Sequence, residues 1–458
     1  MKTRGWKIGF EKHEQRRDAM KTRTRPGAWI GALAVLAALA TATAQAAVRT
    51  ATTTGYWTNT ATWSDSTVPL AGDDVVINGG VIVTVDVAVA DLASLSVTGT
   101  FVSATWDSGI TSTTVNVGSG GVLTHTVQVD TDSSDGWQTN SRVYVVCSNL
   151  TVASGGAINA DGKGYAGAPQ TTWAENEIPG RGPGGGGSHP DGGGGGGYGG
   201  LGGQRPSFGY RGPTYGDPSA PDQPGSGGGA RQEAGNGGRG GGAIRIAASG
   251  TVTVAGTVSA NGATGTPHGG GSGGSVNIQC DTLAGGGVIR ANGGNAGANF
   301  VGQGGGGRIK LDYADASGWS GTVTAEPGTG GHAGNVAGQR GTLWLADDTL
   351  LGSSVVGTTW RVYGITSWSP ASLSMSGGAS LAFEEPGFDL TVAGDATVDA
   401  STLVLSLDAQ AGADTVTLTA GGSLLLTNAA SVTVHGANTP QNATDTNYGA
   451  LIGVTNDL

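Results

Sequence analysis

The sequence predicts an all-β fold, a parallel β-helix or solenoid of short strands that carries a glycine-rich insert. Glycine accounts for 89 of the 458 residues and charged residues for only 12%, whereas ordinary globular domains contain roughly 7% and 25%. Short segments rich in valine, isoleucine and threonine recur, and after residue 46 no stretch has the apolar spacing of an amphipathic helix. Some of these segments repeat at a fixed period, which is typical of stacked units.

The N-terminus is predicted to be a secretory signal peptide covering residues 1–46. A basic stretch from Lys2 to Arg25 precedes an apolar run from Ala28 to Ala40, and Ala44-Gln45-Ala46 has the pattern of a cleavage site. A membrane anchor is the alternative, but the apolar run is shorter than the ~20 residues that cross a bilayer. We therefore expect a secreted, extracellular or cell-surface protein with no membrane span after cleavage.

The remaining residues, 47–458, are strongly acidic. Residues 1–46 hold nine of the 23 Lys and Arg and three of the 34 Asp and Glu, which leaves 14 basic and 31 acidic residues and a net charge near −17. No Lys/Arg cluster remains, which argues against nucleic acid and anionic membranes as partners and makes divalent cations plausible ones. The expected macromolecular partners are extracellular polysaccharide or envelope components. The two cysteines, Cys147 and Cys280, are compatible either with a disulfide or with buried free thiols.

Residues 47–149 are expected to form an N-terminal β region. Turn residues at 72–74 and 78–80 flank a Val-Val-Ile strand, and the β-branched run from Val81 to Val85 follows directly. The region therefore consists of short strands separated by tight turns.

Residues 150–313 contain the repeats that carry most of the argument. Segments 152–162, 254–262 and 286–293 share the closing pattern apolar-x-Ala-(Asp/Asn)-Gly. A second motif, Gly-Gly followed by an alternating strand, places Ile244, Val276 and Ile309 at steps of about 32 residues. A short strand cannot bury its apolar face alone, so each unit must stack on the next. The Asn/Asp-Gly pairs are expected to supply corners with positive φ.

An insert at 163–242 interrupts the repeats, and glycine makes up more than about a third of it. Two interpretations are open. Glycine-rich stretches often behave as flexible linkers. Alternatively, they form extended polyglycine II-type helices, which have three residues per turn and must bond to their neighbours. The aromatic residues Tyr198, Phe208, Tyr210 and Tyr215 favour order.

Residues 314–458 are expected to form a C-terminal β-solenoid region. Short strands are predicted around Leu381, Leu390 and Leu403 and again around Val416, Leu425 and Val432, at intervals of about ten residues. The pattern continues to the end of the chain without a polar cap, which leaves open that the solenoid is truncated there.

One loop is a candidate calcium site. Asp130, Asp132 and Asp135 precede Gly136 in an arrangement similar to the start of an EF-hand, although no glutamate stands where a bidentate ligand is needed. A polar surface loop explains the same residues. Calcium is the only cofactor that the sequence suggests.

Catalytic residues are not expected. Parallel β-helices host many polysaccharide-active enzymes, but fold alone does not supply function. Lys163 and Lys310 are the only lysines after the signal, and Glu384-Glu385 is an adjacent carboxylate pair, but nothing in the sequence brings them together. The histidines at 125, 189, 268, 332 and 435 are interpreted as solvated loop residues. The rings of Trp173, Tyr198, Tyr210 and Tyr215 could stack on sugars, but packing against glycine-rich backbone is favoured.

Residues 150–313 resemble the glycine-rich β-solenoid surface proteins of environmental bacteria. The opening LTVASGGAINADGKGY, the core GGRGGGAIRIAASGTVTVAGTVSANG and the closing GGGGRIKLDY carry this resemblance, which covers somewhat more than a third of the chain. Near the N-terminus, ATWSDSTVPLAGDDVVINGGVIVTVD is similar to the eight-glycine domain of extracellular glycan-related proteins. Both resemblances imply an extracellular location and a role in contact or scaffolding, and neither transfers a catalytic residue.

The expected function is therefore that of a secreted structural or adhesive surface protein without catalytic activity. A glycan-binding module is the first alternative, and a polysaccharide lyase or glycoside hydrolase on a β-helix is the second.

Overall fold

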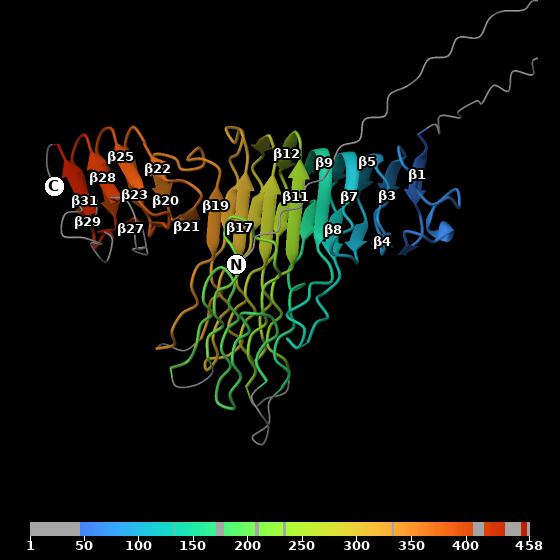
Figure 1. Ribbon diagram of the computed structural model, residues 1–458, viewed down its shortest axis with the longest axis horizontal. Coiled ribbons are helices and arrows are strands. Elements are labelled where there is room, and N and C mark those ends of the chain that lie inside the picture. The colour runs from blue at the N-terminus through green and yellow to red at the C-terminus, as the bar shows by residue number, and fades with distance from the viewer. Residues whose placement is uncertain are drawn as a thin grey trace, which may run out of the picture. The chain divides into compact units, whose positions relative to one another are not determined.

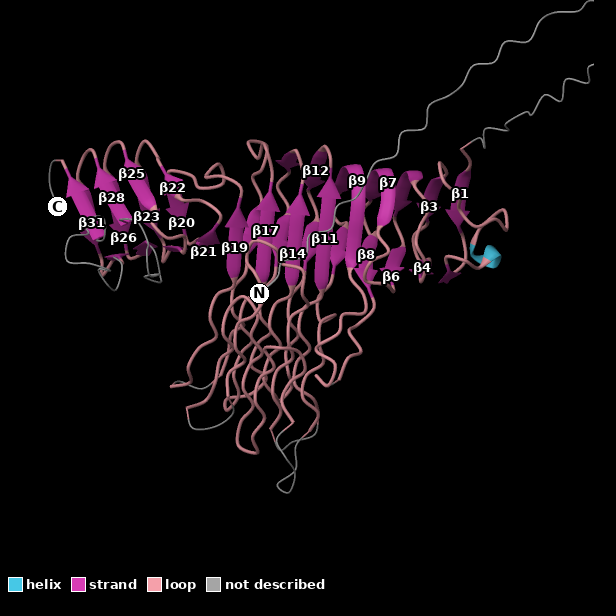
Figure 2. Cartoon of the chain, in the orientation of Figure 1, coloured by secondary structure: helices cyan, strands magenta, loops and turns pink. Residues whose placement is uncertain are grey.

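The computed structural model describes residues 46–131, 133–170, 178–206, 210–231, 235–331, 334–405, 416–435 and 450–455, all within one compact unit, Ala44–Leu458. Apart from residue 46, the expected signal peptide lies outside the described residues. The described residues form β-strands and loops, with a single 3₁₀ turn, η1 (Thr60–Thr62) (Figure 2). No helix in these ranges is long and apolar enough to span a membrane.

The largest sheet, here called the long sheet, has fifteen strands joined by parallel pairings. Its main path runs, in order, through β1 (Val48–Ala51), β3 (Asp74–Ile77), β5 (Leu92–Val97), β7 (Ile110–Val117), β9 (Val143–Val152), β11 (Ala243–Ala248), β14 (Ser275–Gln279), β17 (Arg308–Asp312), β19 (Thr342–Leu345), β21 (Thr359–Tyr363), β24 (Ser380–Phe383), β27 (Thr402–Leu405) and β30 (Ser431–Val434). Two further strands, β12 (Thr251–Val254) and β15 (Thr282–Ala284), pair beside this path.

A second sheet has eight strands, which come from residues 55–324 and lie between strands of the long sheet along the chain. Its members are β2 (Gly55–Tyr56), β4 (Ile82–Val85), β6 (Thr100–Ser103), β8 (Val122–His125), β10 (Ala157–Asn159), β13 (Thr257–Ser259), β16 (Val288–Arg290) and β18 (Thr322–Thr324). The chain thus passes from one sheet to the other and back, and each such circuit is one rung. This alternation is consistent with the parallel β-solenoid that the sequence predicts.

Beyond β19 each rung has three strands, because two four-stranded sheets accompany the long sheet (Figure 1). One contains β20 (Ser354–Val356), β23 (Leu373–Ser376), β26 (Ala396–Asp399) and β29 (Leu424–Thr427); the other contains β22 (Ser367–Trp368), β25 (Asp389–Val392), β28 (Val416–Ala420) and β31 (Ala450–Val454). The strands expected around Leu381, Leu390, Leu403, Val416, Leu425 and Val432 are confirmed.

The repeated sequence motifs lie directly above one another in the stack. Ile244 pairs in register with Val276, and Val276 pairs with Ile309, so the second motif forms one row of the long sheet. The first motif does the same in the second sheet, where Ile158, Val258 and Ile289 are in register and fully buried. These rows fill the space between the sheets, which is how stacking covers the apolar face of each short strand.

The closing turn of the first motif is held by a ladder of side-chain amides and carboxylates. Asp161 Oδ1 accepts the Asn261 N–H (2.6 Å), Asn261 Oδ1 accepts the Asn292 N–H (2.8 Å) and Asn292 Oδ1 accepts the Glu326 N–H (2.8 Å). Each side chain thus satisfies a backbone donor of the next rung.

The expectation that every Asn/Asp-Gly pair has a glycine with positive φ is wrong for two of the three pairs. Gly162 has the expected positive φ of 62°, but Gly262 and Gly293 do not lie in the left-handed region. Glycine is needed at position 262 for a different reason, since a Cβ there would lie 2.1 Å from the Gly271 carbonyl oxygen.

The glycine-rich segments lead into β11, β14, β17 and β19, and they lie together beyond the starts of these strands (Figure 1). They bond to one another through their backbones. Three consecutive N–H groups, those of residues 194–196, donate to three different segments, at the carbonyls of Gly187 (2.8 Å), Gly203 (2.8 Å) and Gly270 (2.9 Å). The bonded set extends beyond residues 163–242, because Gly302 donates to Gly193 and Gly305 to Gly196.

Both cysteines are buried free thiols. Cys147 pairs with Ala248, and the register of β11 with β14 places Cys280 one strand further on. Two strand spacings are roughly 9.6 Å, more than the Cα separation of about 7 Å that a disulfide tolerates. Burial raises the pKa of the Cys147 thiol to about 11 and that of Cys280 to about 12.

Candidate functional site

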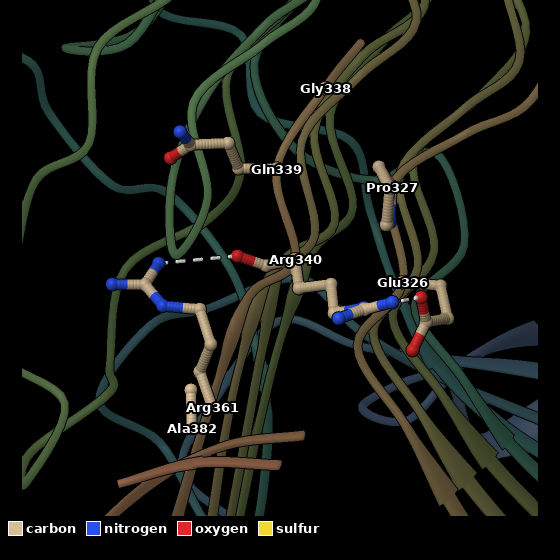
Figure 3. Close-up of a pocket in the computed structure, with 7 residues that line it drawn as sticks. All are labelled: Glu326, Pro327, Gly338, Gln339, Arg340, Arg361 and Ala382. Atoms are coloured by element: carbon tan, nitrogen blue, oxygen red, sulfur yellow. Dashed lines mark hydrogen bonds and ion pairs between the residues drawn. The ribbon is translucent and has the colours of Figure 1, made fainter. Parts of the chain in front are cut away.

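A surface cleft of about 500 Å³ lies where β21 and β24 adjoin residues 326–327 and 338–340. Its lining combines two arginines, a glutamate, a glutamine and small or apolar residues: Glu326, Pro327, Gly338, Gln339, Arg340, Arg361 and Ala382. Figure 3 shows Gln339 and Arg361 on one side of the opening, with Arg340, Glu326 and Pro327 on the other.

Arg361 joins the cleft to both the long sheet and the glycine-rich segments. Its Nε lies 2.7 Å from Glu384 Oε1, and its Nη1 donates to the carbonyls of Arg340 and Gly199, at 3.3 Å each. The Glu384 side chain is only 7% exposed, so this ion pair is largely shielded from water. Arg361 therefore has a fixed position at the edge of the cleft.

Arg340 forms the opposite wall. Its Nε lies 3.3 Å from Glu326 Oε2, and its Nη1 donates to Ser380 Oγ at 2.8 Å. Glu326 also accepts a hydrogen bond from Thr359 Oγ1. The two carboxylates at this site, Glu326 and Glu384, are thus each held by an arginine. Guanidinium and amide N–H groups at the rim suit binding of an anionic or hydroxyl-rich group.

The candidate calcium loop is described in part. Asp132 lies outside the described residues. Asp130 Oδ2 accepts the Gln138 N–H at 2.6 Å, and the carbonyl of exposed Asp135 accepts a hydrogen bond from Gln138 Nε2 at 2.9 Å. Across the described ranges, no group of three or more His, Cys, Asp or Glu side chains could hold a metal ion. The site remains a sequence-based prediction.

The structure places Lys310 in β17 of the long sheet and Glu384 directly after β24 of the same sheet, which the sequence did not predict. Lys310 lies over the Trp344 ring, 4.4 Å from its centroid, and 3.3 Å from Asp312 Oδ2. Trp344 and Tyr363 occupy the two strands between Lys310 and Glu384. Three strand spacings are about 14 Å. Glu385 instead accepts the Gly364 N–H at 2.8 Å.

The interpretation of the histidines as solvated is wrong for His125 and His268, which are both fully buried, and is confirmed for exposed His435. His268 Nδ1 accepts the Arg231 N–H at 3.0 Å. His189 is partly exposed beside Asp191, and His332 lies outside the described residues. Packed glycine-rich backbone, which carries no side chains of its own, leaves room for imidazole rings inside the protein.

His125 is neutral in the folded protein. Its Nδ1–H donates to the Thr126 carbonyl (2.7 Å) and its Nε2 accepts the Ala243 N–H (3.3 Å), so both ring nitrogens are occupied. Burial lowers the pKa of His125 from 6.5 to about 3. Between pH 6.5 and pH 3, His125 is therefore protonated in the unfolded chain but not in the folded protein.

We expect the free energy of unfolding to fall by about 1.4 kcal/mol per pH unit below pH ~6.5, down to pH ~3, because of His125. Urea unfolding at pH 7.5 and 4.5 should show a loss about 2–3 kcal/mol larger in the native sequence than in His125→Gln. Equal pH dependence in both proteins would contradict the buried neutral imidazole.

The expected packing of aromatic rings is confirmed for Tyr198 and Tyr215. Tyr198 is buried, and the Tyr215 ring lies 4.6 Å from it, with the Tyr215 hydroxyl donating to the Pro224 carbonyl. Tyr210 is 81% exposed, and Trp173 and Phe208 lie outside the described residues. Sugar stacking on Tyr198 is therefore excluded in this conformation.

Arg308 is a structural residue that sequence reasoning did not identify. It lies on the outer side of β17 but is only 5% exposed, because the glycine-rich region covers it. Its Nε and Nη2 donate to the Tyr215 carbonyl (3.0 and 2.7 Å), its Nη1 donates to Thr342 Oγ1 (3.1 Å), and its guanidinium lies over the Tyr198 ring. Arg308 thus fastens the insert to the strand stack.

Comparison of the chain with protein-family models, with curated proteins and with solved structures gave no match.

Proposed function

We propose that this chain is a secreted structural or adhesive protein of the cell surface, without catalytic activity. The observation that carries the proposal is that backbone hydrogen bonds connect most of the structure. Strands pair along four parallel sheets, and glycine-rich segments bond to several neighbours at once. Such a body is stiff and presents long regular faces, which suits contact and scaffolding.

The proposal includes polyglycine II-type helices in the glycine-rich region. A helix with three residues per turn aims successive N–H groups about 120° apart. Donation by residues 194–196 to three different segments fits this geometry, and residues 227–229 repeat it toward Arg181, Gly238 and Gly194. A β-strand would instead direct alternate N–H groups to two sides only.

The extracellular location is supported by the signal-like residues 1–46 and by the small fraction of charged residues and high glycine content of the chain. Expression of the full chain in a bacterial host, followed by fractionation, tests it. We expect the mature chain on the cell surface or in the medium, with a new N-terminus at Ala47. Retention of the whole precursor in the cytoplasm would overturn this part of the proposal.

The absence of catalysis is tested with a panel of neutral and acidic polysaccharides. We expect no release of reducing ends or unsaturated products. Release that disappears in Lys310→Ala or Glu384→Ala would instead establish a lyase or glycoside hydrolase.

A glycan-binding module is the second candidate, and the cleft favours it. Arg340, Arg361 and Gln339 present N–H donors around one opening, as a binding site for carboxylate or hydroxyl groups requires. Binding of a polysaccharide without turnover, weakened by Gln339→Ala, would support this candidate.

A further inference from the structure

Six side chains form one continuous row across the long sheet, here called the outer row. β9, β11, β14, β17, β19 and β21 lie side by side in the long sheet (Figure 1), and their pairings place the six residues in register from strand to strand. In order they are Tyr144, Arg245, Asn277, Lys310, Trp344 and Tyr363.

The outer row faces away from the core. Its members alternate with fully buried residues, as Ile244 and Ile246 on either side of Arg245 show. Arg245 is exposed and the other five side chains are partly exposed. The row two residues earlier, which includes Arg308, is covered by the glycine-rich region. The outer row is therefore the row next to the glycine-rich region whose side chains are accessible to solvent.

Cations and aromatic rings contact one another along the row. The Arg245 guanidinium lies 5.1 Å from the centroid of Tyr144, and Lys310 Nζ lies 4.4 Å from that of Trp344. Arg142 extends the pattern at the β9 end, since it lies 4.8 Å from the Tyr144 ring and 4.7 Å from Trp106. These contacts hold the long side chains in place before any ligand arrives.

The spacing of the row suits a chain of sugars. Strands repeat every 4.7–4.9 Å, so the six positions extend over roughly 24 Å. That repeat is comparable to the length of one pyranose unit in an extended polysaccharide. Aromatic faces can stack on sugar rings, Arg245 and Lys310 can pair with carboxylates, and the Asn277 amide between them can bond to hydroxyls.

The charge of the row contrasts with that of the chain around it. Two of the 14 basic residues after position 46, Arg245 and Lys310, lie in it, in a segment with a net charge near −17. Asp312 offsets part of this charge, with its Oδ2 3.3 Å from Lys310 Nζ. Arg245 forms no ion pair with any of the described residues at the distances that define one, so its charge is available to a ligand.

We propose that the outer row binds an extended uronic-acid polysaccharide, and this proposal rests on the adhesive function proposed above. A uronic-acid polysaccharide offers carboxylates to Arg245 and Lys310, ring faces to the aromatic residues and hydroxyl groups to the Asn277 amide. Single-stranded DNA also binds through stacking and cations, so it is the competing ligand in the test below.

The test measures binding of purified residues 47–458 to polygalacturonate by affinity electrophoresis. We expect retardation that weakens with salt, and at least about tenfold weaker binding by Arg245→Gln/Lys310→Met, equivalent to about 1.4 kcal/mol. Trp344→Ala should weaken binding by a similar factor, and Trp344→Phe by less. Arg181→Gln, which removes a charge from the glycine-rich region, should bind like the native sequence.

Methyl-esterified polygalacturonate is the matched ligand control, because it keeps the chain and loses the charge. Equal binding of both forms, or unchanged binding by folded Arg245→Gln/Lys310→Met, would overturn the proposal. Tighter binding of single-stranded DNA than of polygalacturonate would also overturn it. Melting curves of each variant confirm folding. If the protein is at the cell surface but does not bind polygalacturonate, the ligand proposed for the outer row is wrong and the adhesive function stands. If the protein binds polygalacturonate but stays in the cytoplasm, the proposed surface function is wrong and the ligand stands.

Discussion

Replacement of Gly195 by alanine should lower the free energy of unfolding by at least about 3 kcal/mol, because the added methyl group has no space. A Cβ at this position would lie 1.8 Å from the carbonyl oxygen of Gln303. The obstacle is backbone that is itself bonded, since the same Gln303 carbonyl accepts the Gly203 N–H at 2.7 Å. Neither segment can move without breaking hydrogen bonds to a third.

Urea unfolding and amide exchange of residues 193–203 measure this effect. Gly79→Ala is the matched control, because the nearest atom to its Cβ would be the Thr98 carbonyl oxygen at 3.8 Å and its φ is not left-handed. The control should change stability by no more than about 1 kcal/mol, and in the stabilising direction if it changes at all. If Gly195→Ala is as stable as this control, the glycine-rich segments are not packed as described.

Replacement of Arg308 by methionine should destabilise the protein by about 3 kcal/mol and release the insert from the strand stack. The substitution keeps an unbranched apolar side chain over Tyr198 but removes three hydrogen bonds, two of them to the Tyr215 carbonyl. A carbonyl left without a donor beneath the insert is costly because little water reaches it.

Calorimetry and limited proteolysis of residues 210–224 measure the two consequences. Lys310→Met is the matched control, since it removes a charge from the same face of β17 two residues further on, outside the covered area. The control should change stability by less than about 0.5 kcal/mol. Equal proteolysis rates in Arg308→Met and Lys310→Met would show that Arg308 does not fasten the insert.

The strand stack was predictable because each strand shows its buried face in a few consecutive residues. Ile244, Val276 and Ile309 each alternate with polar neighbours and recur at a steady interval, so the sequence shows both the buried face and the stacking. Stacking in turn fixes the register of every other residue in these strands. The outer row could have been predicted in the same way. Arg245 stands between Ile244 and Ile246, and the residues at the equivalent position in the neighbouring strands belong to the same row.

The glycine-rich region was not predictable at the same level. Gly194 bonds to Gly187 and Gly196 to Gly270, but nothing distinguishes these glycines from their neighbours in the sequence. A run of identical residues does not specify which residue of one segment pairs with which residue of the next. For the same reason the burial of Arg308 could not be foreseen, since alternation in β17 places it on the outer face with Lys310.

The candidate site was predictable only in its parts. The sequence singled out Lys310 and Glu384 as chemically capable residues, but not the cleft of Arg340 and Arg361, whose walls come from separate rungs. Arg340 precedes β19 and Arg361 lies within β21, and no spacing in the sequence indicates that the two share a site.

The cross-bonding of the glycine-rich segments sets the order in which the polypeptide can mature. Residues 193–196 exchange hydrogen bonds with Gly270, Gly302 and Gly305, which leave the ribosome more than seventy residues later. Until those partners are present, the amides in this stretch of a chain of about 200 residues can bond only to water, and little drives the stretch to collapse. This part of the molecule therefore cannot pack before synthesis has passed β17, so its earliest residues wait for its latest ones.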